Sequence, residues 1–206
     1  MNVVELFCGT KSFANVAQER GHNIFTTDNN SMFKPTICCD ILSFHPKTIP
    51  FKVDVLWASP PCTFFSVASI GKHWNKDHTP KTEQAVLGIK IVEKTLNIIK
   101  ELNPTYWFIE NPRGKLRKLD IMDNLLRQTV TYCQYGDTRM KPTDIWTNHK
   151  GWTPRPICKN GDPCHVSAPR GSRTGTQGLK GNMERSIVPK DLCMEILQYI
   201  EKEKND

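Results

Sequence analysis

The sequence lacks the features that would place the chain in a membrane or send it out of the cell. No uninterrupted apolar run approaches the roughly 20 residues with which a helix crosses a bilayer. The amino terminus shows no succession of basic residues, apolar stretch and small-residue cleavage site, so we find no signal peptide. These absences predict a cytoplasmic protein without a membrane partner.

The cysteines do not indicate a disulfide framework. There are eight of them, and in a cytoplasmic chain they should stay mostly reduced. Cys158, Cys164 and His165, perhaps with Cys133, form a conceivable zinc set. Zinc needs four ligands and this spacing fits no standard template, so the sequence favours reduced thiols and we assign no metal site from it.

Size and charge allow one medium domain with an anionic partner. The chain has 206 residues, of which 38% are hydrophobic and 24% charged, as in ordinary globular proteins. The net charge is +7, and basic residues gather between Arg113 and Lys118 and between Lys150 and Arg185. Such clustering is typical of contacts to phosphates, although a solvated surface explains the charge equally well.

Strand-like segments alternate with amphipathic helices along the first two thirds of the chain. The expected strands are 3–7, 23–27, 53–58 and 106–110. The expected helices are 12–20, one from Pro80 to Pro104 and a final one around 192–200. Ser12 should cap the first helix, and Pro80 should lie in the first turn of the second. The pattern predicts an α/β fold with a mostly parallel sheet and right-handed crossovers.

Polar and reactive residues lie where the predicted strands end, which is where such sheets bind ligands. They are Cys8–Ser12, Asp28, Ser59–Ser66 and Glu110–Pro112. Gly9 lets a ligand approach the backbone, and a carboxylate such as Asp28 can accept from two ribose hydroxyls. Because many α/β proteins have a glycine turn and an aspartate, this pattern alone does not identify a cofactor.

Cys62 gives a sharper signal. It follows two prolines at the end of a buried strand, and the prolines hold the loop rigid. A thiolate fixed in this way attacks unsaturated carbon well. Glu110 ends another strand of the same sheet and can contact a base edge or handle a proton. The plainer alternatives are a buried structural cysteine and an exposed carboxylate.

In their order along the chain, these motifs resemble those of the C5-cytosine DNA methyltransferases. The cofactor motifs are matched by Phe7-Cys8-Gly9, Asp28, Asp40 and the stretch 185–192. The catalytic motifs are matched by Pro60-Pro61-Cys62, Glu110-Asn111, Arg139 and Lys141. The chain departs from the family pattern at several positions: Thr10, Lys11 and Ser12 replace Gly-rich residues, Pro112 a valine, Lys141 an arginine and Arg185-Ser186 a Gly-Asn pair, and the glutamine expected ahead of Arg139 is absent.

The resemblance implies a Rossmann-like fold, plus a small irregular basic segment, that binds S-adenosylmethionine and methylates carbon 5 of a cytosine flipped out of duplex DNA. It implies that Cys62 attacks carbon 6, that Glu110 binds ring nitrogen N3 and the amine, and that Arg139 steadies the carbonyl oxygen. The implied catalytic residues are Cys62, Glu110, Arg139 and Lys141. The implied cofactor-binding residues are Phe7, Cys8, Gly9, Thr10, Ser12, Asp28, Asn29, Asp40, Ile41, Pro60, Ser186 and Val188.

Three regions are expected. Residues 1–149 form the catalytic and cofactor-binding core, 150–183 a reduced target-recognition segment, and 184–206 a final motif and helix that return to the core. The middle region is rich in Gly, Pro, Ser, Thr and Arg and is too short for a core of its own. The expected DNA contacts are Ser66, Lys72, Arg113, Arg155, Arg170 and Arg173.

Other functions remain open from the sequence. A relative of the family methylates transfer RNA, and a degenerate descendant would only bind DNA. The second alternative is less favoured, because a binding module has no need of Cys62, Glu110 and Arg139 together. A third alternative keeps Cys62 and changes the transferred group. The small chain resembles an orphan, phage-encoded methyltransferase, and the sequence fixes neither its target motif nor its oligomeric state.

Overall fold

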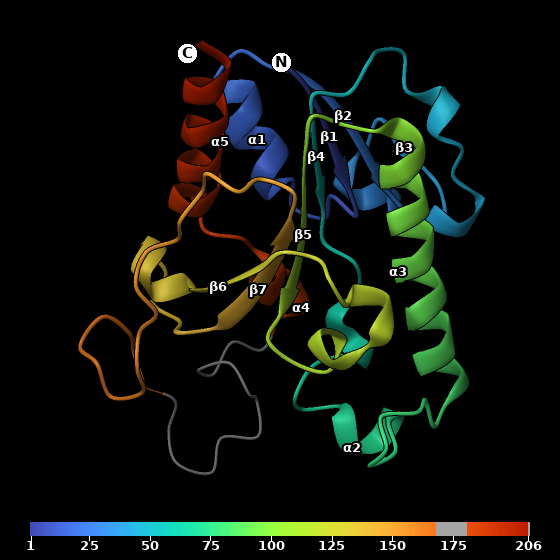
Figure 1. The fold of residues 1–206 in the computed structure, drawn as a ribbon, viewed down its shortest axis with the longest axis vertical. Coiled ribbons are helices and arrows are strands. Elements are labelled where there is room, and N and C mark those ends of the chain that lie inside the picture. Colours follow the sequence, from blue (N-terminus) through green and yellow to red (C-terminus); the bar gives the residue numbers. More distant parts are fainter. Residues whose placement is uncertain (168–180, 206) are drawn as a thin grey trace.

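A seven-stranded sheet forms the centre of the computed structural model, which describes residues 1–167 and 181–205 (Figure 1). The strand order is β3-β2-β1-β4-β5-β7-β6. The strands are β1 (Asn2–Leu6), β2 (Asn23–Asp28), β3 (Ile37–Cys38), β4 (Val55–Ala58), β5 (Tyr106–Pro112), β6 (Arg127–Thr131) and β7 (Pro142–Thr147). Neighbours among β1 to β5 pair in parallel, whereas β7 is antiparallel to both β5 and β6.

Helices cover both faces of this sheet, as the sequence predicts. Helices α1 (Ser12–Glu19) and α5 (Lys190–Asn205) lie side by side on one face, and α3 (Glu83–Leu102) covers the other (Figure 1). Alternate residues of β4 supply both cores: Val55 and Trp57 pack toward α1 and α5, and Leu56 toward α3. Among the described residues, no helix is long and apolar enough to cross a bilayer. The expected α/β class is confirmed.

The starts of two helices differ from the prediction. The N-cap of α1 is Lys11 rather than Ser12, and the helix's free N–H groups at Phe13 and Ala14 donate to the buried carboxylate of Glu5. Glu5 from the neighbouring strand thus replaces a local cap. Helix α3 begins at Glu83 rather than at Pro80, because the hydroxyl of Thr82 accepts from its first turn.

Two short helices flank the carboxyl edge of the sheet. Helix α2 (Ile70–His73) follows the loop of Cys62, and α4 (Asn182–Ser186) precedes α5. The segment after the Cys62 loop therefore contains a helical turn, and Trp74 at its end is buried.

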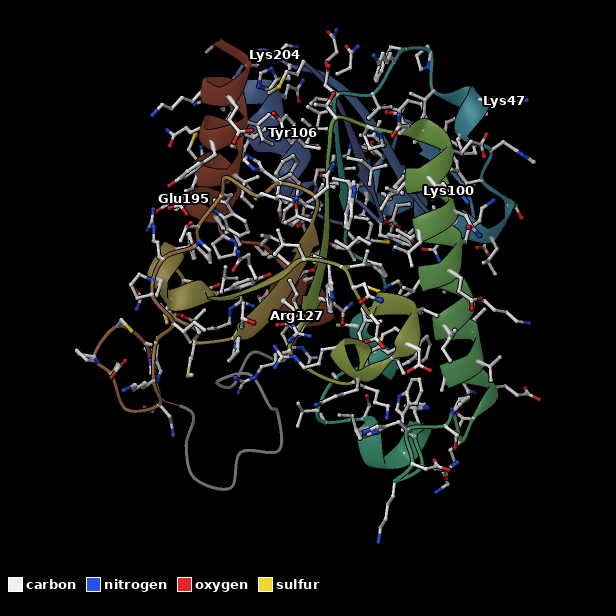
Figure 2. The ribbon with its side chains drawn as sticks, viewed as in Figure 1. Lys47, Lys100, Tyr106, Arg127, Glu195 and Lys204 are labelled. Carbon is white, nitrogen blue, oxygen red and sulfur yellow. The ribbon has the colours of Figure 1, made fainter. Side chains whose placement is uncertain are left out.

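Residues 148–167 contain neither helix nor strand. This segment leaves β7 and crosses toward α5, where Trp152 is fully buried and donates to Glu195. Figure 2 shows Glu195 on the side of α5 along which the segment passes. The lack of helix and strand in residues 148–167 agrees with the irregular structure expected from the sequence. The predicted DNA contacts Arg170 and Arg173 lie outside the described residues.

Candidate active site at the carboxyl edge of the sheet

The loop of Cys62 is tied directly to strand β5. Cys62 begins a one-turn 3₁₀ helix immediately after β4 and its two prolines. Asn111, next to Glu110 in β5, donates from its side-chain amide to the carbonyl oxygen of Pro60 at 2.9 Å. Cys62 and Glu110 therefore share one edge of the sheet, as the strand pattern predicts.

The loop after β5 supports the Cys62 loop from behind. The backbone N–H of Lys115 donates to the carbonyl oxygen of Phe65 at 2.7 Å. A Cβ on Gly114 would lie only 2.2 Å from that oxygen, so glycine is needed for the close approach. The indole of Trp74 donates to the carbonyl oxygen of Phe64. The sequence analysis missed Gly114, whose only signal was its place after the Glu110 strand.

Opposing charges surround the thiol of Cys62. Burial raises the pKa of Cys62 above its usual value, and the charge of Glu110 raises it further. Lys141 and Arg185 lower it, by a smaller amount. Cys62 therefore rests as a protonated thiol at neutral pH, and two cations beside it favour the thiolate once the proton leaves.

The carboxylate of Glu110 is held by a residue that the sequence analysis did not identify. The hydroxyl of Tyr132 donates to Oε1 of Glu110 at 2.9 Å, and both side chains are buried. Burial raises the pKa of Tyr132 well above its usual range, so the phenol keeps its proton and remains a donor. Tyr132 lies in a 3₁₀ turn (Tyr132–Tyr135) without periodicity, which left no pattern to detect.

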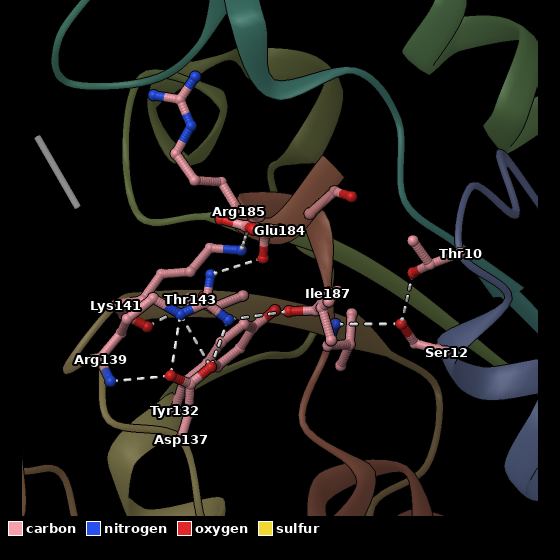
Figure 3. A network of polar contacts seen from close by, with 12 residues as sticks. Thr10, Ser12, Tyr132, Asp137, Arg139, Lys141, Thr143, Glu184, Arg185 and Ile187 are labelled. Atoms are coloured by element: carbon pink, nitrogen blue, oxygen red, sulfur yellow. Dashed lines mark hydrogen bonds and ion pairs between the residues drawn. The ribbon is translucent and has the colours of Figure 1, made fainter. Parts of the chain in front are cut away.

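Arg139 belongs to a network of polar contacts with α4. Its guanidinium pairs with Asp137 and donates to the carbonyl oxygens of Glu184, at 3.1 Å, and Ile187, at 3.3 Å (Figure 3). Those carbonyls belong to α4 and the turn after it. Arg139 thus holds the last predicted cofactor motif against the core.

Lys141, the second predicted basic residue, lies closer to the reactive groups. Its ammonium donates to the carbonyl oxygen of Arg185 at 2.9 Å and lies 4.5 Å from the ring centroid of Tyr132 (Figure 3). Burial lowers the pKa of Lys141, whereas the charges of Glu110 and Cys62 raise it. Lys141 therefore interacts with both reactive groups, and it is the cation that can face a base held between them.

The predicted cofactor motifs meet beside this site. Gly9, with φ of 45°, donates its N–H to one oxygen of Asp28, and Asn30 donates to the other, both at 2.9 Å. A carboxylate has about four acceptor positions, so Asp28 keeps capacity for ligand hydroxyls. The backbone N–H of Val188 donates to the hydroxyl of Ser12 at 3.2 Å. The first and last motifs are therefore side by side.

The remaining predicted cofactor residues differ in exposure. Cys8, Ile41 and Pro60 are buried, whereas Asn29, Asp40 and Ser186 are exposed. Burial raises the pKa of Cys8 to about 12, so it is an inert thiol. Phe7 and Thr10 are half-buried at the edge, where the hydroxyl of Thr10 lies 3.2 Å from that of Ser12. Ser186 donates its hydroxyl to Met183 within α4.

A basic hollow of about 390 Å³ lies between the segment around α2 and the loop after β5. Its lining includes the exposed side chains of Lys76, Arg113 and Lys118. Lys72 is exposed nearby in α2, and the hydroxyl of Ser66 is hydrogen-bonded to that of Ser69. The hollow does not include Arg155, whose guanidinium contacts Glu195 of α5. The predicted DNA contacts that the structure describes therefore occupy two separate places.

The fold is shared with a solved structure. A putative DNA modification methyltransferase encoded within an E. coli prophage matches with a TM-score of 0.51 and 13% identity, over 71% of this chain and 46% of that one. The DNMT2 of Spodoptera frugiperda matches with a TM-score of 0.48 and 19% identity, over 71% of this chain and 49% of that one. The chain spans about half the length of these structures. Its fold is the Rossmann-like fold of S-adenosylmethionine-dependent methyltransferases.

The family follows from the sequence match. Residues 1–128 match the C-5 cytosine-specific DNA methylase family. The chain is also 28% identical, over 220 residues, to a probable DNA (cytosine-5)-methyltransferase of Frog virus 3 (isolate Goorha), a match that covers 96% of this chain and 99% of that protein. The chain belongs to the C-5 cytosine-specific DNA methylase family, and the resemblance noted in its motifs is confirmed.

Proposed function

We propose that the chain transfers a methyl group from S-adenosylmethionine to carbon 5 of cytosine in DNA, with Cys62 as covalent nucleophile. One observation carries the proposal: Cys62 and Glu110 lie at the same carboxyl edge of the sheet, where Asn111 beside Glu110 donates to the carbonyl oxygen of Pro60 in the Cys62 loop. The family and the name of the viral relative favour DNA over RNA.

The residues beside the site fit this cofactor. S-adenosylmethionine, when bound, supplies a methyl group on an electron-poor sulfonium. Asp28 has acceptor capacity for ribose hydroxyls, and the adjoining Gly9 turn leaves open space for a ligand. Asp40 is exposed at the start of a 3₁₀ turn and can accept from an amino group. Arg139 would support binding indirectly, through the segment that it tethers.

Each reactive residue then has a role. Cys62 loses its proton to solvent, and its sulfur bonds to carbon 6 as the electrons of the carbon 5–carbon 6 double bond shift into the ring, which makes carbon 5 nucleophilic. Glu110, oriented by Tyr132, accepts a hydrogen bond from the exocyclic amine and holds the proton that N3 takes up as charge builds, and Lys141 stabilises the charge on the carbonyl oxygen. Carbon 5 accepts the methyl group. Loss of the carbon 5 proton then re-forms the ring double bond and expels the Cys62 thiolate.

The first experiment measures transfer of labelled methyl groups to duplex DNA, single-stranded DNA and transfer RNA. We expect 5-methylcytosine in DNA, and a loss of roughly 10⁴-fold or more in Cys62→Ala, as when other covalent nucleophiles are removed. Cofactor binding should survive in that variant. Label in transfer RNA alone would replace DNA by RNA in the proposal, and no transfer to any substrate would favour a non-catalytic binding protein.

A second experiment separates Lys141 from Arg139. Lys141→Gln should lower kcat by roughly 10²–10³-fold, as expected when a donor to a developing oxyanion is lost. Activity should increase with pH as the Cys62 thiol ionises. In Lys141→Gln this increase should occur at higher pH, because the ammonium that lowers the pKa of Cys62 is gone. Arg139→Gln should instead weaken cofactor binding. Equal effects of the two variants on kcat, with cofactor affinity unchanged, would return the oxygen contact to Arg139.

A further inference from the structure

Three thiols and an imidazole converge at the point where the irregular segment 148–167 meets the core. Cys133 belongs to the 3₁₀ turn after β6, whereas the other three groups lie on the segment itself. Their ligand atoms all lie within 4.8 Å of one another. The set consists of Cys133, Cys158, Cys164 and His165.

The distances within this cluster match those around a tetrahedral metal ion. Zinc binds sulfur at about 2.3 Å and nitrogen at about 2.0 Å, which places tetrahedral ligand atoms roughly 3.6–3.8 Å apart. The sulfur of Cys164 lies 3.6 Å from that of Cys133 and 3.2 Å from that of Cys158. Nδ1 of His165 lies 3.2 Å from Cys158 and 3.8 Å from Cys164. Small outward movements of the thiols would centre an ion among the four atoms.

We propose that this chain binds one zinc ion through three thiolates and one imidazole, those of Cys133, Cys158, Cys164 and His165. Binding releases the three thiol protons to solvent, and Nδ1 of the neutral ring completes the site. Cys133 and Cys158 are buried whereas Cys164 is exposed, so the ion has a path of entry from solvent. Thiolate and imidazole in tetrahedral arrangement favour zinc over magnesium or calcium, which prefer oxygen ligands.

Apart from a few side-chain contacts, the segment has little apolar packing to hold its position. Within residues 148–167, Ile157 and Val166 are exposed by more than half, and Trp152 is the large apolar side chain that is fully buried. A segment with so little apolar burial gains most from a crosslink to the core. The zinc ion would supply that crosslink, because Cys133 is anchored in the core and the other three ligands are not.

The metal site also adjoins the candidate active site. Cys133 directly follows Tyr132, whose hydroxyl orients Glu110. An ion on Cys133 would therefore fix both the 3₁₀ turn that carries Tyr132 and the basic segment that begins at Lys150. This inference goes beyond the proposed methyl transfer and stands if that proposal fails, because metal content is measured without substrate.

The test measures metal in the full chain, purified under reducing conditions without a metal-affinity column. Elemental analysis should find about one equivalent of zinc. Cys164→Ser and His165→Ala should each lose it, whereas Cys38→Ser, which alters an exposed thiol outside the cluster, should retain it. Less than about a tenth of an equivalent in wild-type protein would overturn the proposal, as would stoichiometric iron.

Two further measurements guard against variants that simply misfold. Wild-type protein loaded with cobalt should show the visible absorption of a tetrahedral thiolate site, and Cys38→Ser should give the same spectrum. Chelation of wild-type zinc should expose residues 148–167 to protease while α3 and the sheet stay protected. A Cys158–Cys164 disulfide found by mass spectrometry in unreduced wild-type protein would contradict the proposal, since that bond removes two ligands.

Discussion

The carboxyl edge of the sheet and the segment 148–167 are ordered by different means. At the edge, strands β1, β2, β4 and β5 end together between two layers of helices, and buried side chains surround the reactive groups. The segment has no backbone ladder, and specific side-chain contacts hold it instead. For example, the backbone N–H of Arg155 donates to the hydroxyl of Tyr135, and the backbone N–H of Cys158 donates to the hydroxyl of Thr131.

This difference predicts how each region responds to change. A site built on strands is positioned by many weak interactions, so single surface changes leave it in place. A segment held by a few anchors fails when one of them is removed. The methyl-transfer chemistry is therefore expected to depend on the carboxyl edge of the sheet. The placement of the basic segment is expected to depend on a few residues, such as Trp152 and the four proposed zinc ligands.

The largest effect on stability is expected at Trp152, which anchors the segment 148–167. Trp152→Ala should destabilise the protein by about 3–5 kcal/mol, because it removes a fully buried indole packed on Phe108. Urea unfolding gives the measurement. Ile157→Ala is the matched control in the same segment, and its exposed side chain should matter by less than about 0.5 kcal/mol. Equal costs for the two would mean that packing does not anchor the segment.

A smaller effect is expected at the edge. Gly114→Ala places a methyl group against the carbonyl oxygen of Phe65, and overpacking of this kind costs about 1–3 kcal/mol. Because that carbonyl belongs to the Cys62 loop, methyl transfer should fall more than cofactor binding does. Gly71→Ala is the control, since its added methyl meets nothing within 4 Å. Full activity in Gly114→Ala would show that the close contact between Gly114 and Phe65 does not position the Cys62 loop.

The sequence predicted the edge better than the residues that support it. Apolar strands such as Val55–Ala58 are buried on both faces, so their pattern is strong and correctly places the residues that follow them. Strand β7 was not predicted, because it buries polar residues. Asp144 within it is fully buried, and its charge is balanced by Arg117 from a distant loop. Such pairing depends on tertiary structure and leaves no periodic signal.

The same limit applies to the candidate site. Cys62 and Glu110 follow strands and were identified, whereas Tyr132 and Gly114 act through contacts between loops that are distant in sequence. The sequence analysis named Arg139 and Lys141 together, and the fold gives them different partners: Arg139 pairs with Asp137, whereas Lys141 interacts electrostatically with Glu110 and Cys62. The sequence offered Cys133, Cys158, Cys164 and His165 as a conceivable zinc set that fits no standard template, and the fold brings their ligand atoms within 4.8 Å of one another.

A pH-dependent effect is expected at the buried carboxyl under α1. Burial raises the pKa of Glu5 to about 8 from 4.5, although the N–H groups of Phe13 and Ala14 favour its charged form. Between those two values the folded protein binds a proton that the unfolded chain has lost. Stability contributed by Glu5 should therefore fall as pH rises through this window, by at most about 1.4 kcal/mol per pH unit.

Glu5→Gln removes this titration while keeping an acceptor for the helix. The free energy of unfolding of wild type, relative to Glu5→Gln, should decrease as pH rises from 4.5 to about 8 and then level off. Urea unfolding across that range measures the difference directly, and charges elsewhere cancel because both proteins share them. A pH-independent difference would mean that the pKa of Glu5 is not raised. The N–H groups at the start of α1 would then donate to an ionised carboxylate throughout this pH range.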